Sequence, residues 1–136
     1  MILLDTSVLS AVLRRRQTGL ERAVTERLEN LLKSGERVAV PGVVLQELLS
    51  GVRDAKRFEE LKRVILRGYP IMAASVGDHL MAAEVLSRCR RGGVVVSSME
   101  ALIAALAINA RAKLFALDED FERISKVVAL RLLPVD

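Results

Sequence analysis

The sequence contains one cysteine, one histidine and no tryptophan, and aromatic residues make up only 3% of its 136 positions. The lone Cys89 excludes an internal disulfide. With His79 as the only histidine, a zinc site built from several Cys or His ligands is excluded as well. Any metal ion must therefore be bound by oxygen ligands. No apolar run approaches the ~20 residues that cross a bilayer, so we expect a cytoplasmic protein with no membrane partner.

Hydrophobic residues supply 51% of the chain, and most of them are leucine, valine, alanine and isoleucine. This composition favours helices packed on a small sheet over a β-sandwich, in which aromatic residues are more frequent. The length suits one domain whose core needs no disulfide or structural metal. We therefore expect residues 1–136 to form a single domain.

Short apolar runs alternate with longer segments of helical spacing. The expected strands cover residues 1–4, 38–40, 69–72 and 113–117, with 127–130 as a return to the sheet edge. The expected helices cover residues 8–13, 20–33, 43–52, 55–66, 76–91 and 99–111, with a last helix after Asp118. Because the connections are too long for hairpins, this order predicts an α/β fold with a mostly parallel sheet and helices on both faces.

A carboxylate directly follows the first expected strand. Asp5 stands between the apolar run Met1–Leu4 and the helical pattern that begins at Val8. In an open α/β sheet, ligands bind at the carboxyl ends of the strands, so an acid there is placed for chemistry. The alternative is a helix N-cap, where Asp is favoured because its side chain accepts hydrogen bonds from the first turn.

A second acid, Glu47, lies inside an expected helix with Gly51 four residues further on the same face. A Lys or Arg would be the usual partner at that position on a solvent face, whereas Gly lowers helix propensity by about 1 kcal/mol. The pattern favours an acid beside an open patch. The alternative is that Gly51 only marks the end of the helix and Glu47 is an exposed residue without a role.

Further acids follow the later elements. Asp118 comes after an apolar strand and before a helix, as Asp5 does, although Asp120 competes with it for the N-cap. Glu100 completes the pattern Ser-x-x-Glu with Ser97, which is typical of a capping box. On sequence alone, capping is the favoured role of Glu100, and Asp118 is the better ligand candidate of the two aspartates.

Four segments then agree in order and spacing with a known pattern: Asp5–Ser7, Val44–Gly51, Glu100–Ala105 and Leu114–Phe121. They resemble the four signature blocks of the PIN-domain ribonucleases, specifically the VapC-type toxins. The resemblance implies a PIN-like three-layer αβα sandwich with a central, mostly parallel sheet. It also implies a metal-dependent endoribonuclease, with Mg²⁺ or Mn²⁺ held by clustered carboxylates, that hydrolyses RNA phosphodiester bonds.

The resemblance extends to individual residues and to partners. The residues that fall on the family's catalytic and metal-binding acids are Asp5, Glu47, Glu100 and Asp118, with Ser7 and Asp120 in support. A toxin of this kind is expected to form a homodimer and to bind a VapB-type antitoxin protein that occupies the active-site groove.

Two positions depart from the family pattern. Glu100 stands where Asp is usual, and Ala116 stands where a Thr or Ser usually precedes the fourth acid. They keep open an alternative, a degenerate PIN-like module that binds RNA or a protein without cleavage. A phosphorylation receiver also gathers acids at strand ends, but no acid follows Val38–Val40 and no strand-end lysine is evident.

The charge balance suits a polyanionic substrate. The net charge is +4, so the chain outside the four acids carries +8, and basic surface is expected around an acidic pit. Arg14, Arg15 and Arg16 are candidates for phosphate contacts, although the helix begun at Asp5 is expected to point them away from the strand ends. Their alternative role is as solvated or partner-binding residues.

Overall fold

The computed structural model describes residues 1–136 and contains a sheet of five strands in the order β3-β2-β1-β4-β5, with every neighbouring pair parallel. The strands are β1 (Ile2–Leu4), β2 (Val38–Pro41), β3 (Ile71–Met72), β4 (Lys113–Phe115) and β5 (Arg131–Leu132). The helices are α1 (Thr6–Val12), α2 (Gly19–Lys33), α3 (Gly42–Ser50), α4 (Ala55–Gly68), α5 (Val76–Arg91), α6 (Ser98–Asn109) and α7 (Glu119–Ser125). The expected mostly parallel α/β sheet is confirmed.

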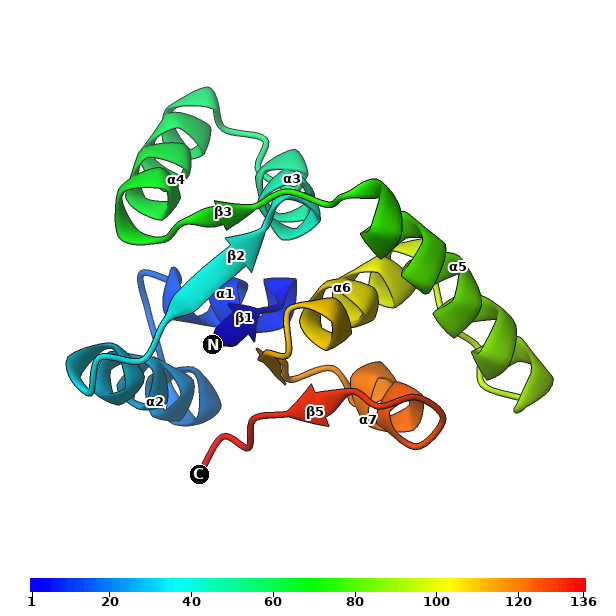
Figure 1. Cartoon of the computed structure of the whole chain (residues 1–136). Helices are drawn as coiled ribbons and strands as arrows, with labels where there is room; N and C mark the ends of the chain where they lie inside the picture. The colour runs from blue at the N-terminus through cyan, green and yellow to red at the C-terminus, as the bar shows by residue number, and fades with distance from the viewer.

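The helices form two layers around this sheet. Contacts link α1 with α2 and α3, and α3 with α4, whereas α6 contacts both α5 and α7. In Figure 1, α5, α6 and α7 lie to the right of the sheet and α2 and α4 lie to its left. The helices α3 and α6 also contact each other. The three-layer αβα arrangement is confirmed, and none of its helices combines the length and apolar character needed to cross a membrane.

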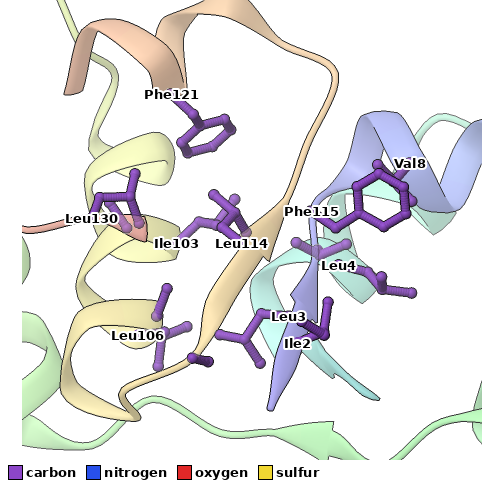
Figure 2. Close-up of a cluster of buried hydrophobic side chains, with 14 of the residues drawn as sticks. Ile2, Leu3, Leu4, Val8, Ile103, Leu106, Leu114, Phe115, Phe121 and Leu130 are labelled. Atoms are coloured by element: carbon purple, nitrogen blue, oxygen red, sulfur yellow. The ribbon is translucent and has the colours of Figure 1, made fainter. Parts of the chain in front are cut away.

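The strands are apolar on both faces because helices cover both faces of the sheet. All three residues of β1 are buried. Figure 2 shows Leu114 beside Ile103 on the α6 side, whereas the neighbouring Phe115 lies beside Val8 on the α1 side, as the twofold side-chain period of a strand requires. Thirty buried residues form one contiguous apolar cluster. The single domain expected for residues 1–136 stays a prediction.

The expected strand at residues 127–130 is wrong. Val127 and Val128 lie in the turn that ends α7, where both backbone N–H groups donate to the Ile124 carbonyl, and the strand begins later, at Arg131. The apolar run has another cause: Val128 and Leu130 are buried in the core without strand pairing. Apolar character thus marked burial there, and periodicity over four residues could not distinguish a strand from a packed loop.

Leu114→Ala tests the central position of β4. The side chain of Leu114 is fully buried, so its truncation leaves a cavity and should lower the free energy of unfolding by about 2–5 kcal/mol. The matched control is Leu80→Ala on α5, whose side chain is 68% exposed and whose loss should change stability by less than about 0.5 kcal/mol. Urea unfolding measures both, and equal losses would contradict the fold as described.

Candidate active site

Asp5 lies at the carboxyl end of β1 and is the only buried charged or polar residue, with 5% of its surface exposed. Its N–H donates to the Phe115 carbonyl at 3.0 Å. Its carboxylate accepts hydrogen bonds from the Ser7 hydroxyl at 2.8 Å and the Ser7 N–H at 3.3 Å. Asp5 is therefore the N-cap of α1, and this capping role is compatible with a place in the site.

The Ser7 hydroxyl links two loops of the site. It donates to Asp5 and accepts the N–H of Leu117 at 2.9 Å. Leu117 lies between β4 and α7, so this oxygen ties the β1–α1 junction to the β4–α7 loop. Both hydrogen-bonding capacities of Ser7 are used by the protein itself, which fixes the orientation of Asp5.

Glu100, Asp118 and Asp120 form the tightest group of acids. One carboxylate oxygen from each lies within 4.8 Å of the others. Glu100 completes the expected capping box, in which its Oε1 accepts the Ser97 N–H at 2.9 Å. Asp118 is the N-cap of α7, and its Oδ1 accepts the Asp120 N–H at 2.9 Å. Asp120, which was expected only to support the site, thus lies next to two of the predicted metal ligands, Glu100 and Asp118.

A cavity of about 420 Å³ brings together all four acids predicted as ligands, namely Asp5, Glu47, Glu100 and Asp118. They come from the end of β1, from α3, from α6 and from the start of α7. Glu47 is exposed and makes no hydrogen bond or ion pair with the protein. Asp120 does not line this cavity, and its carboxylate pairs with Arg123.

Two carboxyl groups of the site, those of Asp5 and Glu100, have raised pKa values. Burial raises the pKa of Asp5, the hydrogen bonds from Ser7 lower it in part, and the nearby charge of Glu47 raises it again. Burial also raises the pKa of Glu100, to which the neighbouring Asp120 adds. Two carboxylates 5 Å apart repel by roughly 3 kcal/mol at an effective dielectric constant of 20. The site therefore favours a proton or a cation between its acids.

A second hollow of about 370 Å³ adjoins this cavity and shares Thr6 and Glu47 with it. Gly51 and Arg14 line it too, so the open patch expected beside Glu47 exists, although Gly51 is also the C-cap of α3. Arg14 lines this hollow from beyond the end of α1, and its guanidinium pairs with Glu21 at 3.4 Å. The helix α1 ends at Val12, earlier than expected, and the chain turns before Arg14.

Sequence reasoning missed two residues of these hollows. Arg57 lines the second hollow, held by a bond from its guanidinium to the Leu13 carbonyl at 2.9 Å. Thr6 lies in the walls of both hollows, and its Oγ1 is buried without a hydrogen-bond partner. Arg57 lies too far along the chain from any motif to be recognised by spacing. Thr6 was part of the first signature block.

A model of the PIN domain matches residues 2–127. The chain is a VapC-type member of the PIN-domain family. It is 34% identical to a VapC ribonuclease of Mycobacterium bovis and to Ribonuclease VapC11 of Mycobacterium tuberculosis, over 96% of both chains in each case.

Solved structures agree with the VapC-type fold. The structure of FitAcB from Neisseria gonorrhoeae superposes with a TM-score of 0.80 at 21% identity, covering 99% of this chain and 98% of the other. VapBC2 from Rickettsia felis, bound to a promoter DNA fragment, gives 0.80 at 21% identity, over 98% of each chain. VapC20 of Mycobacterium tuberculosis, a toxin that cleaves the sarcin-ricin loop, gives 0.71 at 19% identity, over 96% and 99%.

The raised pKa of Asp5 predicts a pH-dependent stability of the metal-free VapC-type protein. A carboxyl group whose folded pKa is raised stabilises the fold below its unfolded value, 3.8 for Asp, and this contribution is lost as the pH rises through the folded pKa. Asn at position 5 cannot ionise, so the Asp5→Asn variant does not lose this contribution to stability as the pH rises. In EDTA, the free energy of unfolding of the wild type should therefore fall relative to Asp5→Asn as the pH rises above about 4.

Urea unfolding over a pH series measures this difference, and an excess of Mg²⁺ or Mn²⁺ should reduce it by binding the wild-type acids. A difference that stays constant with pH would show that the Asp5 carboxylate is not strained by its surroundings.

Ser7→Ala should uncouple the two loops of the site. It removes a donor to Asp5 and leaves the Leu117 N–H without its acceptor, at a loss of about 1–3 kcal/mol in unfolding free energy. The pKa of Asp5, followed by carboxyl NMR, should rise because a bond that stabilises the charged form is gone. Ser10→Ala, an exposed change on the same helix, is the control and should leave both quantities unchanged.

Proposed function

We propose that this protein is a metal-dependent endoribonuclease that hydrolyses RNA phosphodiester bonds and serves as the toxin of a toxin–antitoxin pair. The observation that carries the proposal is the convergence of Asp5, Glu47, Glu100 and Asp118 on one cavity from four separate elements. Membership among the VapC-type PIN proteins supports the reaction class. We assign these four residues as the metal-binding and catalytic acids.

The donor set suits a hard divalent cation, for which we propose Mg²⁺ or Mn²⁺. The cavity offers carboxylate oxygens and no His or Cys, which is the chemistry that these ions prefer. Burial first, and nearby carboxylates second, raise the pKa values of Asp5 and Glu100, and a bound cation would favour the charged form of both. When bound, such an ion lowers the pKa of water and stabilises charge on the phosphate during an in-line displacement.

The chain's own residues orient this chemistry. Asp5 is fixed by Ser7, whose hydroxyl already donates one hydrogen bond and accepts another, so Ser7 acts as a positioning residue and not as a nucleophile. Glu47 has no protein partner and is free to contact the ion or to accept a proton from water.

The RNA strand is proposed to run from the acidic cavity into the adjoining hollow. The two share Thr6 and Glu47, and Arg14 and Arg57 lie further along, where guanidinium groups can bind phosphates. A VapB-type antitoxin segment would inhibit cleavage by occupying this same groove. We further propose a homodimer and a cytoplasmic location, where RNA is accessible.

Glu100 stands where the family usually has Asp. Another helix of this protein shows whether an Asp can make the same capping box. In α5 the same capping box is made by Ser75 with Asp78, one methylene shorter. A box with Asp is therefore geometrically feasible in this chain. Glu100 uses Oε1 for its box, so the longer side chain can cap α6 and still offer its second oxygen to a metal.

Cleavage of RNA by the purified, antitoxin-free protein with Mg²⁺ or Mn²⁺ tests the function. Asp5→Asn should reduce the rate by more than about 100-fold, beyond the effect of losing an outer-shell residue. Glu100→Asp should retain activity within about 10-fold. Glu84→Gln, a change of an exposed and unpaired acid on α5, is the control and should have no effect.

Equal cleavage by wild type and Asp5→Asn would assign the activity to a contaminant. No cleavage with either metal, together with preserved RNA binding, would favour the degenerate module that binds without cleaving.

A further inference from the structure

A basic hollow lies at the amino ends of the strands, opposite the carboxyl ends where the acidic cavity lies. Ile2, Lys113 and Arg131 are the first residues of β1, β4 and β5 and are direct neighbours in the strand register. With Arg27 and Arg111 they line a hollow of about 300 Å³. The four acids of the candidate active site lie beyond the other ends of the strands, on α3 and α6, or next to β1 and α7. The two sites are therefore separate.

The positive charge of this hollow is not balanced. Arg27, Arg111, Lys113 and Arg131 make no ion pair with any carboxylate. The one acid in the hollow, Glu36, pairs with the amino group of Met1 at 3.3 Å. Four arginines elsewhere on the protein, Arg14, Arg15, Arg57 and Arg123, are paired with carboxylates. Four free cations in one concave site attract a polyanion.

Two of these cations are held in place by carbonyl groups. The Arg131 guanidinium donates to the Arg111 carbonyl at 2.7 Å, and Arg27 Nε donates to the Pro134 carbonyl at 3.4 Å. Neutral acceptors orient a guanidinium without cancelling its charge. Since a guanidinium carries five N–H donors, each of these groups keeps donors free for an anion.

Arg111 occupies a backbone conformation that glycine normally takes. Its φ of 54° is the only positive φ of a non-glycine residue in the protein. It follows α6 at the position where Ala112 N–H donates to the Ala107 carbonyl and Arg111 N–H to the Ile108 carbonyl, the pattern of a Schellman motif. An arginine there is strained relative to glycine, and such strain is most readily kept where the side chain has a function.

Arg111 and Arg131 also line a second, more apolar hollow of about 520 Å³, which contains Ile108, Val128 and Leu130. The two arginines therefore stand where the hollows meet. A surface that combines forked cations with apolar side chains suits a ligand with both phosphates and flat, weakly polar groups, as nucleic acids have.

We propose that this basic hollow is a second RNA-binding site, which holds phosphates of a segment distant from the bond that is cleaved. The inference rests on the proposed ribonuclease function for the identity of the polyanion. Arginine forks bind phosphate in a bidentate manner, and a second contact on the same molecule raises the effective concentration of RNA at the active site. The hollow thus favours long or folded RNA over short strands.

RNA binding, followed by fluorescence anisotropy in an Asp5→Asn background, tests the proposal without cleavage. The variant Arg111→Gly plus Lys113→Gln removes two cations, and the plot of log affinity against log salt for a long RNA should become shallower by about 1.4, or 0.7 per phosphate contact. Arg63→Gln plus Arg67→Gln removes the same charge from exposed, unpaired positions on α4 and should change the slope far less. A short single-stranded oligonucleotide should show no difference among the proteins.

Arg111→Gly carries a second readout. Glycine suits φ 54° better than arginine does, so the melting temperature should stay equal or rise while affinity for long RNA falls. A loss of affinity that only follows unfolding would overturn the proposal.

Other results would overturn it too. One is an unchanged salt slope in the Arg111→Gly plus Lys113→Gln variant, and another is an equal decrease of the slope in the α4 control. The proposal would also fail if the variant altered RNA binding only in the complex with antitoxin, or if inorganic phosphate saturated the hollow without affecting RNA binding. Because binding is measured independently of cleavage, a reduced slope in a protein that never cleaves RNA would reject the ribonuclease proposal and retain the second RNA site.

Discussion

The buried carboxylate of Asp5 is the constraint on which the site depends. A parallel sheet that is covered on both faces ends its central strand inside the protein, and Asp5 is the first residue beyond that end, with 5% of its surface exposed. A charge at this depth needs hydrogen bonds. The Ser7 hydroxyl and N–H and the first turn of α1 supply them, so the capping of α1 and the positioning of the acid are one interaction.

The remaining acids follow from this arrangement. Glu100 lies in the first turn of α6 and Asp118 is the N-cap of α7, so both side chains accept N–H groups at a helix N-terminus. Helix N-termini stabilise negative charge and allow several carboxylates to stand within a few ångströms of one another. Burial chiefly raises the pKa values of Asp5 and Glu100, and the nearby charges of Glu47 and Asp120 add to this effect. A cation in the site would offset both.

The meeting of Asp5 with Asp118 could be predicted from the sequence, because the carboxyl ends of parallel strands lie on the same side of the sheet. An acid directly after each of two apolar strands, Asp5 and Asp118, is sufficient to infer that the two meet. Glu100 could not be decided by sequence, since a capping box and a ligand require the same residue at the same spacing. The structure shows the box formed and one oxygen remaining. The proximity of Asp120 to Glu100 and Asp118 depends on how α7 begins, and its supporting role stays a prediction.

Other features could not be read from the chain at all. The basic hollow joins Arg27, Arg111 and Arg131, which are adjacent only through the strand register and the packing of α2. Likewise, Arg14 lines the hollow beside the acidic cavity from the turn that follows α1, which ends at Val12. Local sequence patterns predict helices, strands and their ends. A surface formed by residues from three elements can be predicted only when the order of the strands in the sheet is known.

Crystals soaked with Mn²⁺ test the central claim most directly, because the ion has an anomalous signal. A peak is expected in the cavity, in contact with carboxylate oxygens of Asp5 and of at least one of Glu100 and Asp118. The peak should be absent from Asp5→Asn crystals. A peak confined to the exposed Glu119 and the half-buried Asp120, or no peak in a cavity open to solvent, would contradict the claim that these acids converge to bind a catalytic metal.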